Sequence, residues 1–310
     1  MAISLAMLCR LKWRCPTLLI ATETSMTKKL LFQFDTDTHS SAFDAVVAYD
    51  AGIDHLIPYA GITVDNIEGL VHGAMFTRGD DALKNTAIFV GGSKVSDAEA
   101  ILYKIAKTFI GPVRVSVMLD ANGCNTTAAA TVVCASQEIK LAGSRVVVLG
   151  SGPVGSRVAQ LMCSEGASVV ATDRTKVRAA EVCDRINRLS LSGTAIPSAP
   201  QNAAATLALL SRADIVVACG PAGVHLVDSA TLAAARSLKV AIDLNAVPTA
   251  GIEGIEVANE AKRVGHVLTY GAIGVGGLKM QTHRAAVASL FERNDAVLDA
   301  AEIYGIAKRI

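Results

Sequence analysis

The chain has 310 residues, of which 51% are hydrophobic and 4% aromatic, and its formal net charge is +1. This length fits two domains better than one. A near-neutral charge without a basic block, together with few aromatic residues, argues against a nucleic-acid-binding surface. No run of about 18 residues is free of charges and turn signals, so no membrane-spanning helix is expected.

The cysteine pattern contains no metal-binding signal. Seven cysteines are present, none in a CxxC pair and none at zinc spacing from a histidine. We therefore expect reduced thiols, no metal site and a cytoplasmic location.

Residues 1–25 differ from the rest of the chain. Arg10, Lys12 and Arg14 interrupt their apolar stretch, and no small-residue cleavage site follows, which argues against a secretory signal. Met26 stands just before the first convincing strand. We expect 1–25 to be a disordered extension outside the fold.

The first part of the chain alternates between strand and helix patterns. Ser96 and Glu99 predict a capping box at the start of the third helix. The alternation predicts a mostly parallel sheet covered by helices, which we assign to a substrate domain over 26–124. The predicted strands lie at 29–35, 55–61, 86–92 and 113–120, and the helices at 41–52, 64–76 and 96–111.

The second part repeats the alternation and completes a fold of two α/β domains. A helix at 125–143 opens a Rossmann-type nucleotide-binding domain, assigned to 125–279. The last helices, over about 280–310, are expected to pack on the first domain. The predicted strands are 145–150, 167–173, 213–220, 239–245 and 266–272, and the helices are 175–190, 201–211, 229–237, 277–291 and 295–308.

A glycine-rich loop follows the first strand of the second domain. The stretch "GSGPVG", comprising Gly150, Ser151, Gly152, Pro153, Val154 and Gly155, fits G-x-G-x-x-G between a strand and a helix. The first glycine allows the tight turn, the second lets the backbone approach a pyrophosphate, and the third lets the helix pack close to the strand. The free N–H groups of the helix start then face the phosphates. This context predicts a dinucleotide site.

The nucleotide preference remains open. Asp173 ends the next strand roughly 20 residues after the loop, where an acid binds the ribose hydroxyls of NAD. Arg174 follows directly, and a cation there can pair with the 2′-phosphate of NADP. NAD, NADP or both therefore remain candidates.

Polar residues and glycines collect where strands end, which is where ligands of α/β folds bind. Asp120, Asn122 and Asn125 follow one strand, and Asn245 follows another, where it either touches the nicotinamide or forms a turn. Lys279 and His283 lie four apart, on one face of the helix opened by "GAIGVGGLK". We expect three further residues to pass near the cofactor, namely Gly220, Pro221 and Gly274.

Several longer segments share a resemblance to one enzyme family. "KKLLFQFDTD", "TAIFVGG", "MLDANGCNTTAAA", "GPVG", "DLNAVP" and "GAIGVGGLKMQTHRA" resemble the methylene-tetrahydromethanopterin dehydrogenases of methylotrophic bacteria. The resemblance covers the chain from Thr27 onward. It implies hydride transfer from methylene-tetrahydromethanopterin to NADP or NAD in formaldehyde oxidation, an active site in the cleft between two α/β domains, and a homo-oligomer, either trimer or hexamer.

The resemblance also suggests roles for individual side chains. The lysine of "GGLK", Lys279, is expected to line the active site. Asp120 is a candidate for paired hydrogen bonds to the guanidine-like edge of the pterin, with a strand-end turn as its rival role. Asp44 and His283 are candidates for pterin contacts, against a helix-dipole role for Asp44 and simple packing for His283. The NADP-specific members lack an acid at the position of Asp173, which favours NAD or mixed use.

Two rival functions remain. The first is a methylene-tetrahydrofolate dehydrogenase, although the folate enzymes' Tyr-x-x-x-Lys pattern is absent, since Tyr59 is followed four residues later by Thr63. Cyclohydrolase activity is therefore disfavoured. The second is a non-catalytic NAD(P)-sensing protein, which would keep the glycine loop but would not need Lys279.

Overall fold

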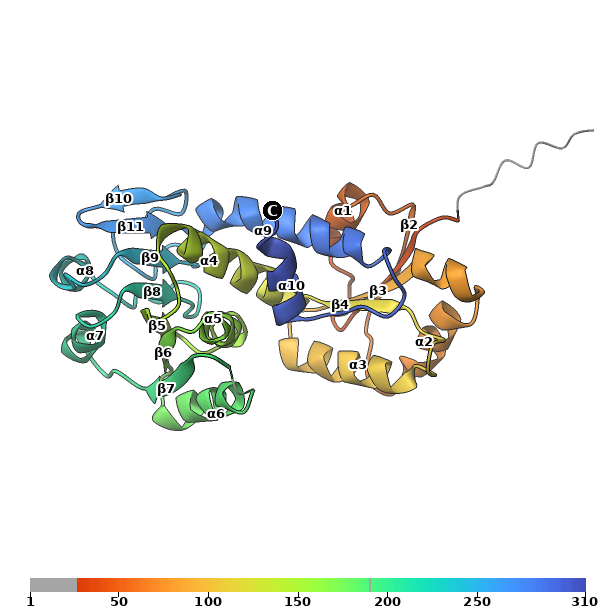
Figure 1. Cartoon of the computed structure of the whole chain (residues 1–310), viewed down its shortest axis with the longest axis horizontal. Coiled ribbons are helices and arrows are strands. Elements are labelled where there is room, and N and C mark those ends of the chain that lie inside the picture. Colours follow the sequence, from red (N-terminus) through yellow and green to blue (C-terminus); the bar gives the residue numbers. More distant parts are fainter. Residues whose placement is uncertain (1–26, 190) are drawn as a thin grey trace, which may run out of the picture.

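The computed structural model describes residues 27–189 and 191–310. The expected disordered extension at 1–25 lies outside these residues. Figure 1 shows two lobes, each built around a β-sheet, joined by long helices that run between them.

The first lobe is built on a parallel sheet of five strands, in the order β12-β4-β3-β1-β2. Its central strands carry apolar side chains on both faces because helices cover both sides. Four of the five strands are β1 (Leu30–Asp35), β2 (His55–Tyr59), β3 (Thr86–Gly91) and β4 (Ser116–Leu119). The fifth, β12, comes from much later in the chain (Val297–Leu298). The covering helices are α1 (Ala42–Asp50), α2 (Glu68–Met75) and α3 (Val95–Thr108), with a 3-10 turn at Asp80–Asn85.

The capping box predicted for α3 is wrong. The helix begins at Val95, one residue before Ser96, and no side chain caps its start. Glu99 instead accepts a hydrogen bond from Arg157, at 2.8 Å, and so takes part in a contact between the lobes.

The second lobe holds a seven-stranded sheet in the order β10-β11-β9-β8-β5-β6-β7. Six of its strands are parallel, and their order is that of a dinucleotide-binding Rossmann sheet, with only β10 antiparallel. The strands are β5 (Arg145–Leu149), β6 (Ser168–Thr172), β7 (Thr194–Ser198), β8 (Ile215–Ala218), β9 (Val240–Asp243), β10 (Lys262–Val264) and β11 (Val267–Tyr270). The helices are α5 (Pro153–Ser164), α6 (Lys176–Asn187), α7 (Ala203–Leu210) and α8 (Ser229–Ala234).

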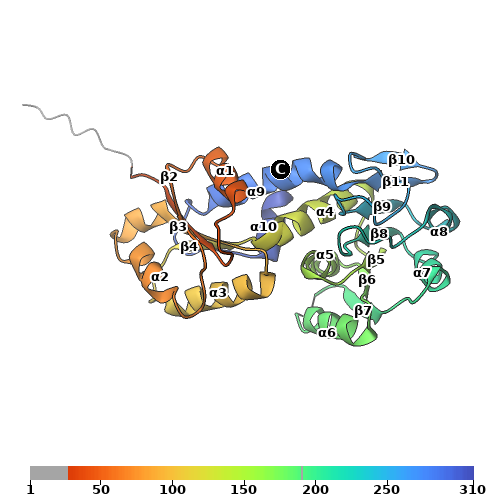
Figure 2. The same ribbon diagram turned by 180° about the vertical axis from the view of Figure 1, so that it is seen from behind.

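Two long helices connect the lobes, as Figures 1 and 2 show from opposite sides. Helix α4 (Cys124–Glu138) leads from the first sheet into the second, and α9 (Ala272–Ser289) leads back. The chain then adds β12 (Val297–Leu298) to the edge of the first sheet, beside β4, and ends in α10 (Ala300–Ala307). Helix α4 is shorter than predicted, and α9 starts five residues earlier than expected, so the proposed boundary at 279 falls inside α9.

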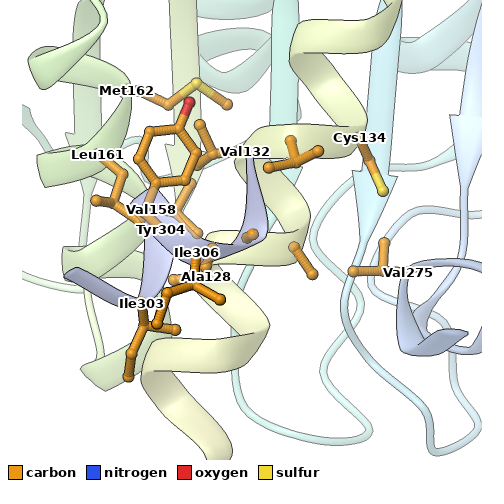
Figure 3. Packing of buried hydrophobic residues seen from close by; sticks show 14 of the residues in the cluster. Ala128, Val132, Cys134, Val158, Leu161, Met162, Val275, Ile303, Tyr304 and Ile306 are labelled. Carbon is orange, nitrogen blue, oxygen red and sulfur yellow. The ribbon is translucent and has the colours of Figure 1, made fainter. Parts of the chain in front are cut away.

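Small side chains let the connecting helices pack closely. Ala128, Ala129 and Ala130 of α4 are fully buried. Figure 3 shows Tyr304 and its neighbours of α10 against α4 and against Val158 and Leu161 of α5. This core therefore contains residues from both the nucleotide-binding lobe and the C-terminal helix.

No helix in the two described ranges has both the length and the apolar character needed to span a membrane. Within the same ranges, no group of three or more histidine, cysteine, aspartate or glutamate side chains is arranged to hold a metal ion.

Candidate active site

A cavity of about 770 Å³ lies at the carboxyl ends of the second sheet's central strands. It has the place and the volume that a dinucleotide needs in a Rossmann fold. Most of the predicted cofactor residues line it: Gly150, Ser151, Gly152, Pro153, Asp173, Arg174, Gly220 and Pro221. Lining residues that were not predicted include Gln201, Asn202 and His225.

The glycine loop has the geometry that phosphate binding requires. Gly150 adopts φ +100°, and a Cβ there would lie 2.8 Å from the carbonyl oxygen of Cys219. A Cβ on Gly155 would meet the carbonyl oxygen of Gly150 at 1.9 Å, so this glycine brings α5 against β5. Gly152 has no atom within 4 Å of a Cβ position, which leaves its backbone open to the cavity. The loop and the start of α5 therefore fit a pyrophosphate.

Acidic and basic groups meet at the adenosine end of this cavity. The Asp173 carboxylate accepts hydrogen bonds from the Ser151 hydroxyl at 2.9 Å and from the Arg174 backbone N–H at 2.7 Å. The Nε of Arg178 lies 3.6 Å away. The carboxylate suits the ribose hydroxyls of NAD, while the two arginines offer positive charge to a 2′-phosphate.

A second cavity, of about 420 Å³, lies at the carboxyl end of the first sheet. Lys279 and Asp44 line it, as predicted candidates for substrate contacts, together with Asp35, Phe43 and Gly123. The Lys279 ammonium lies 4.4 Å from the centre of the Phe43 ring. Burial lowers the pKa of Lys279, although Asp120 and Asp44 act in the opposite direction.

Asp120 and His283 lie close to each other, but neither lines this cavity. Both side chains are about 1% exposed. The Asp120 carboxylate accepts hydrogen bonds from the Thr126 hydroxyl at 2.7 Å and from the backbone N–H groups of Asn125 and Thr126, at 2.9 and 3.0 Å. Its oxygens are thus occupied by the start of α4, so the structure does not place Asp120 where it would touch a pterin.

The imidazole of His283 is stacked on Phe89, with ring centres 5.6 Å apart. Its Nε2 lies 3.9 Å from Asp44 and its Nδ1 lies 4.0 Å from Asp120, beyond hydrogen-bonding distance. Burial lowers the pKa of His283 to about 4, so the ring is neutral near pH 7. Burial also raises the pKa of Asp44 to about 6, while hydrogen bonding to Ser41 acts in the opposite direction.

Four of the predicted cofactor residues do not line either cavity. Val154 and Gly155 lie behind the loop in α5. Asn245 forms a turn, because its side chain donates to the Thr249 carbonyl at 2.8 Å and accepts from the Val247 N–H at 3.1 Å. Gly274 is a packing residue, since a Cβ there would lie 1.9 Å from the carbonyl oxygen of Asn259.

Two residues lie at the junction of the lobes, of which Asn122 was noted in the sequence as a polar residue at a strand end and Arg157 was not. Asn122 lines both cavities. Arg157 of α5 is buried and bonds Asn125 through Nε, the Pro153 carbonyl at 3.2 Å and Glu99 at 2.8 Å. Asn125 also donates to Asp299, the cap of α10, at 2.9 Å. An arginine inside an amphipathic helix gives no sequence signal of such a contact.

Two family models match the chain, one in each lobe. Residues 42–122 match the family model of the N-terminal part of methylene-tetrahydromethanopterin dehydrogenase, and 133–260 match that of shikimate/quinate 5-dehydrogenase. Among solved structures, shikimate 5-dehydrogenase from Listeria monocytogenes gives a TM-score of 0.49 at 12% identity, over 90% of this chain and 96% of that one.

Two relatives from Methylorubrum extorquens extend along nearly the whole chain. One, named bifunctional protein MdtA, is 42% identical over 92% of this chain and 100% of its own length. The other, named NAD(P)-dependent methylenetetrahydromethanopterin dehydrogenase, is 30% identical over 92% of this chain and 99% of its own length. The chain therefore belongs to the methylene-tetrahydromethanopterin dehydrogenase family.

Proposed function

We propose that this enzyme transfers a hydride from methylene-tetrahydromethanopterin to NAD(P)⁺, giving methenyl-tetrahydromethanopterin. The observation that carries the proposal is the junction of the two cavities: a nucleotide cavity and an acidic cavity share a lining residue, Asn122. Ligands bound in the two cavities would meet at this residue. Family membership supplies the pterin as the second ligand.

The chemistry makes modest demands on the protein. The methylene carbon lies between two nitrogens, so loss of hydride leaves a cation delocalised over N–C–N, and the bound nucleotide supplies the acceptor carbon. Alignment of two bound reactants can supply several kcal/mol, up to about 7–11. The chain's residues therefore serve to position the two ligands and to exclude water from the cationic product.

Lys279 and Asp44 are the side chains that we assign to the pterin. Ionised Asp44 complements the positive charge that develops on the pterin. Lys279 projects into the same cavity from α9 and contributes hydrogen-bond donors beside the Phe43 ring. We assign supporting roles to Asp120 and His283. Asp120 orients the turn at Ala121–Gly123, and the neutral His283 ring packs on Phe89 close to Asp44.

An assay matrix tests the proposal. The enzyme is mixed with methylene-tetrahydromethanopterin or methylene-tetrahydrofolate and with NAD⁺ or NADP⁺, and the absorbance of the reduced nicotinamide is followed. We expect turnover with the methanopterin substrate. Turnover with the folate alone would favour the folate enzyme. Nucleotide binding without turnover in any pairing would favour the NAD(P)-sensing protein.

A substitution at Lys279 tests the site within the same assay. Lys279→Met keeps the length of the side chain but removes the ammonium. We expect kcat/KM for the pterin to fall at least about tenfold, the loss of one charge-assisted hydrogen bond, while the Kd for the nucleotide stays within about twofold. Unchanged pterin kinetics would remove Lys279 from the site.

We also propose a homo-oligomer, trimer or hexamer, in the cytoplasm. The family resemblance supports the assembly, and the five cysteines in the described residues, all without disulfide partners there, support a reducing compartment. Sedimentation equilibrium of the full chain tests the assembly, because a monomer at micromolar concentration would contradict it.

A further inference from the structure

Asn122 has a backbone conformation that few residues adopt. It lies in the short turn between β4 and α4 with φ 51° and ψ 24°, in the left-handed region. Asparagine is among the non-glycine residues that tolerate this region best. The next residue, Gly123, is also left-handed, at φ 61°. The backbone N–H of Asn122 donates to the Gly92 carbonyl at 2.8 Å, which fixes the turn against the end of β3.

The Asn122 side chain is not used in holding the turn together. It is exposed, and its amide makes no hydrogen bond to any residue in the described ranges. In many turns an asparagine is retained because its side chain bonds its own backbone. That explanation does not apply here, so the amide is free to bond a ligand.

The position of Asn122 identifies that ligand. The nucleotide cavity begins at Asp173 after β6, passes the glycine loop, and reaches Gly220 after β8. In a Rossmann fold the adenosine lies on the β6 side, so the nicotinamide lies on the β8 side. Asn122 comes from the other lobe and is the residue at which this cavity and the pterin cavity meet. Lys279 lies beside the next residue, since a Cβ on Gly123 would be 3.4 Å from the lysine Cε.

We propose that the side-chain oxygen of Asn122 accepts a hydrogen bond from the carboxamide N–H of the nicotinamide and so fixes the ring face that is turned toward the pterin. This assignment rests on the proposed function. It gives the turn between β4 and α4 a binding role. Asp120 stabilises this turn by accepting hydrogen bonds from the backbone N–H groups of Asn125 and Thr126. Asn122 is thus a cofactor-binding residue contributed by the pterin lobe.

A nucleotide analogue tests the contact directly. In the 3-acetylpyridine analogue an acetyl group replaces the carboxamide and removes its N–H donors. We compare kcat/KM for the natural nucleotide and the analogue in wild type and in Asn122→Gly, which removes the amide and suits the left-handed backbone. We expect the substitution to lower kcat/KM about tenfold with the natural nucleotide and less than about threefold with the analogue. An equal loss with both nucleotides would overturn the proposal.

Two further variants sharpen the comparison. Asn122→Asp keeps an acceptor oxygen, so it should retain more of the wild-type discrimination between nucleotide and analogue than Asn122→Gly does. Gln201→Ala removes an amide from the adenosine end of the same cavity. Whatever its effect on the nucleotide KM, this substitution should leave the kcat/KM ratio between nucleotide and analogue unchanged. An Asn122→Asp ratio equal to that of Asn122→Gly would contradict the acceptor role.

Failure of the proposed reaction would be seen separately. If wild type transfers no hydride with any pterin, the proposed function fails, and the contact is then measured by titration. The Kd values of natural nucleotide and analogue would still differ more in wild type than in Asn122→Gly. Equal differences in the two proteins would overturn the contact itself. The Tm of Asn122→Gly should match or exceed that of wild type, because glycine relieves the left-handed backbone.

Discussion

Asp44 carries a largely buried carboxyl group, and burial makes its ionised form costly. It lines the second cavity from the first turn of α1, and burial raises its pKa to about 6 from the ordinary value of 3.8. The folded state therefore holds a proton that the unfolded chain has already lost between about pH 4 and pH 6. Above that interval both states are ionised, and the folded state bears the cost of a buried charge.

Replacing Asp44 should therefore stabilise the protein and weaken the enzyme. In Asp44→Asn we expect the free energy of unfolding at pH 7 to rise by up to about 3 kcal/mol, and kcat/KM for the pterin to fall. The gain in stability should shrink as the pH falls from about 6 to about 4, because over this interval the folded wild type takes up a proton that the unfolded chain does not yet bind. Urea denaturation across this range measures it. Asp50→Asn, at the exposed end of the same helix, serves as the control. A stability gain that is the same at every pH would show that it does not come from removing the buried charge of Asp44.

Asp173 is the residue on which nucleotide choice should depend. Its carboxylate lies where a 2′-phosphate would approach, and repulsion between the two anions disfavours NADP. We expect Asp173→Ser to raise the ratio of kcat/KM for NADP over NAD about tenfold, because Arg174 and Arg178 remain to attract the phosphate. Arg178→Gln should lower that ratio. Steady-state kinetics with both nucleotides measures this ratio. If neither substitution changes it, this end of the cavity does not determine the choice between NAD and NADP.

At the scale of elements, one buried arginine connects helices from both lobes. Arg157 of α5 contacts Glu99 of α3 and Asn125 of α4, and Asn125 in turn reaches Asp299 at the start of α10. The same asparagine donates its backbone N–H to Asp120. The packing of α5 is thereby linked to the turn that carries Asn122.

The strength of this connection can be measured. We expect Arg157→Met to lower the free energy of unfolding by about 2–3 kcal/mol, since it removes the charged donor of the buried Asn125 oxygen and leaves only the weak Cys124 thiol, at 3.8 Å. Glu99→Gln should cost at most about 1 kcal/mol, because the Glu99 side chain is 49% exposed. Chemical denaturation of both variants gives the comparison. Equal losses would show that the bond to Asn125 contributes nothing.

How far the elements could be predicted depended on how local their signals are. The apolar runs of β3 and β5 and the glycine loop can each be recognised within a few residues of sequence. Both sheets, and the Rossmann fold of the second lobe, could therefore be predicted. The strand β12 has only two residues and pairs with β4, far away in sequence, and β10 is short and mostly exposed. The sequence shows Asn122 at a strand end, but its place between the two cavities depends on how the lobes pack. The contacts of Arg157 depend on the same packing, which no local pattern reports. Asn245 and Gly274 illustrate the converse, because turn formation and close packing use the same residue types as ligand binding.

The whole molecule should unfold as one unit. The core around α4 includes side chains of α5, α9 and α10, so neither lobe keeps its packing when the other opens. We expect a single calorimetric transition whose Tm increases when nucleotide is added. The free energy of unfolding should increase by about 2.7 kcal/mol at a nucleotide concentration of about 100 times Kd. Two transitions, of which only one responds to nucleotide, would show that the lobes are independent.

The late position of β12 in the chain also affects how the protein is made. The first sheet acquires its edge strand from residues 297–298, which leave the ribosome after the entire nucleotide-binding lobe. N-terminal domains commonly fold while synthesis continues. The side of β4 that pairs with β12 therefore cannot be covered by this strand until the nucleotide-binding lobe has been synthesised.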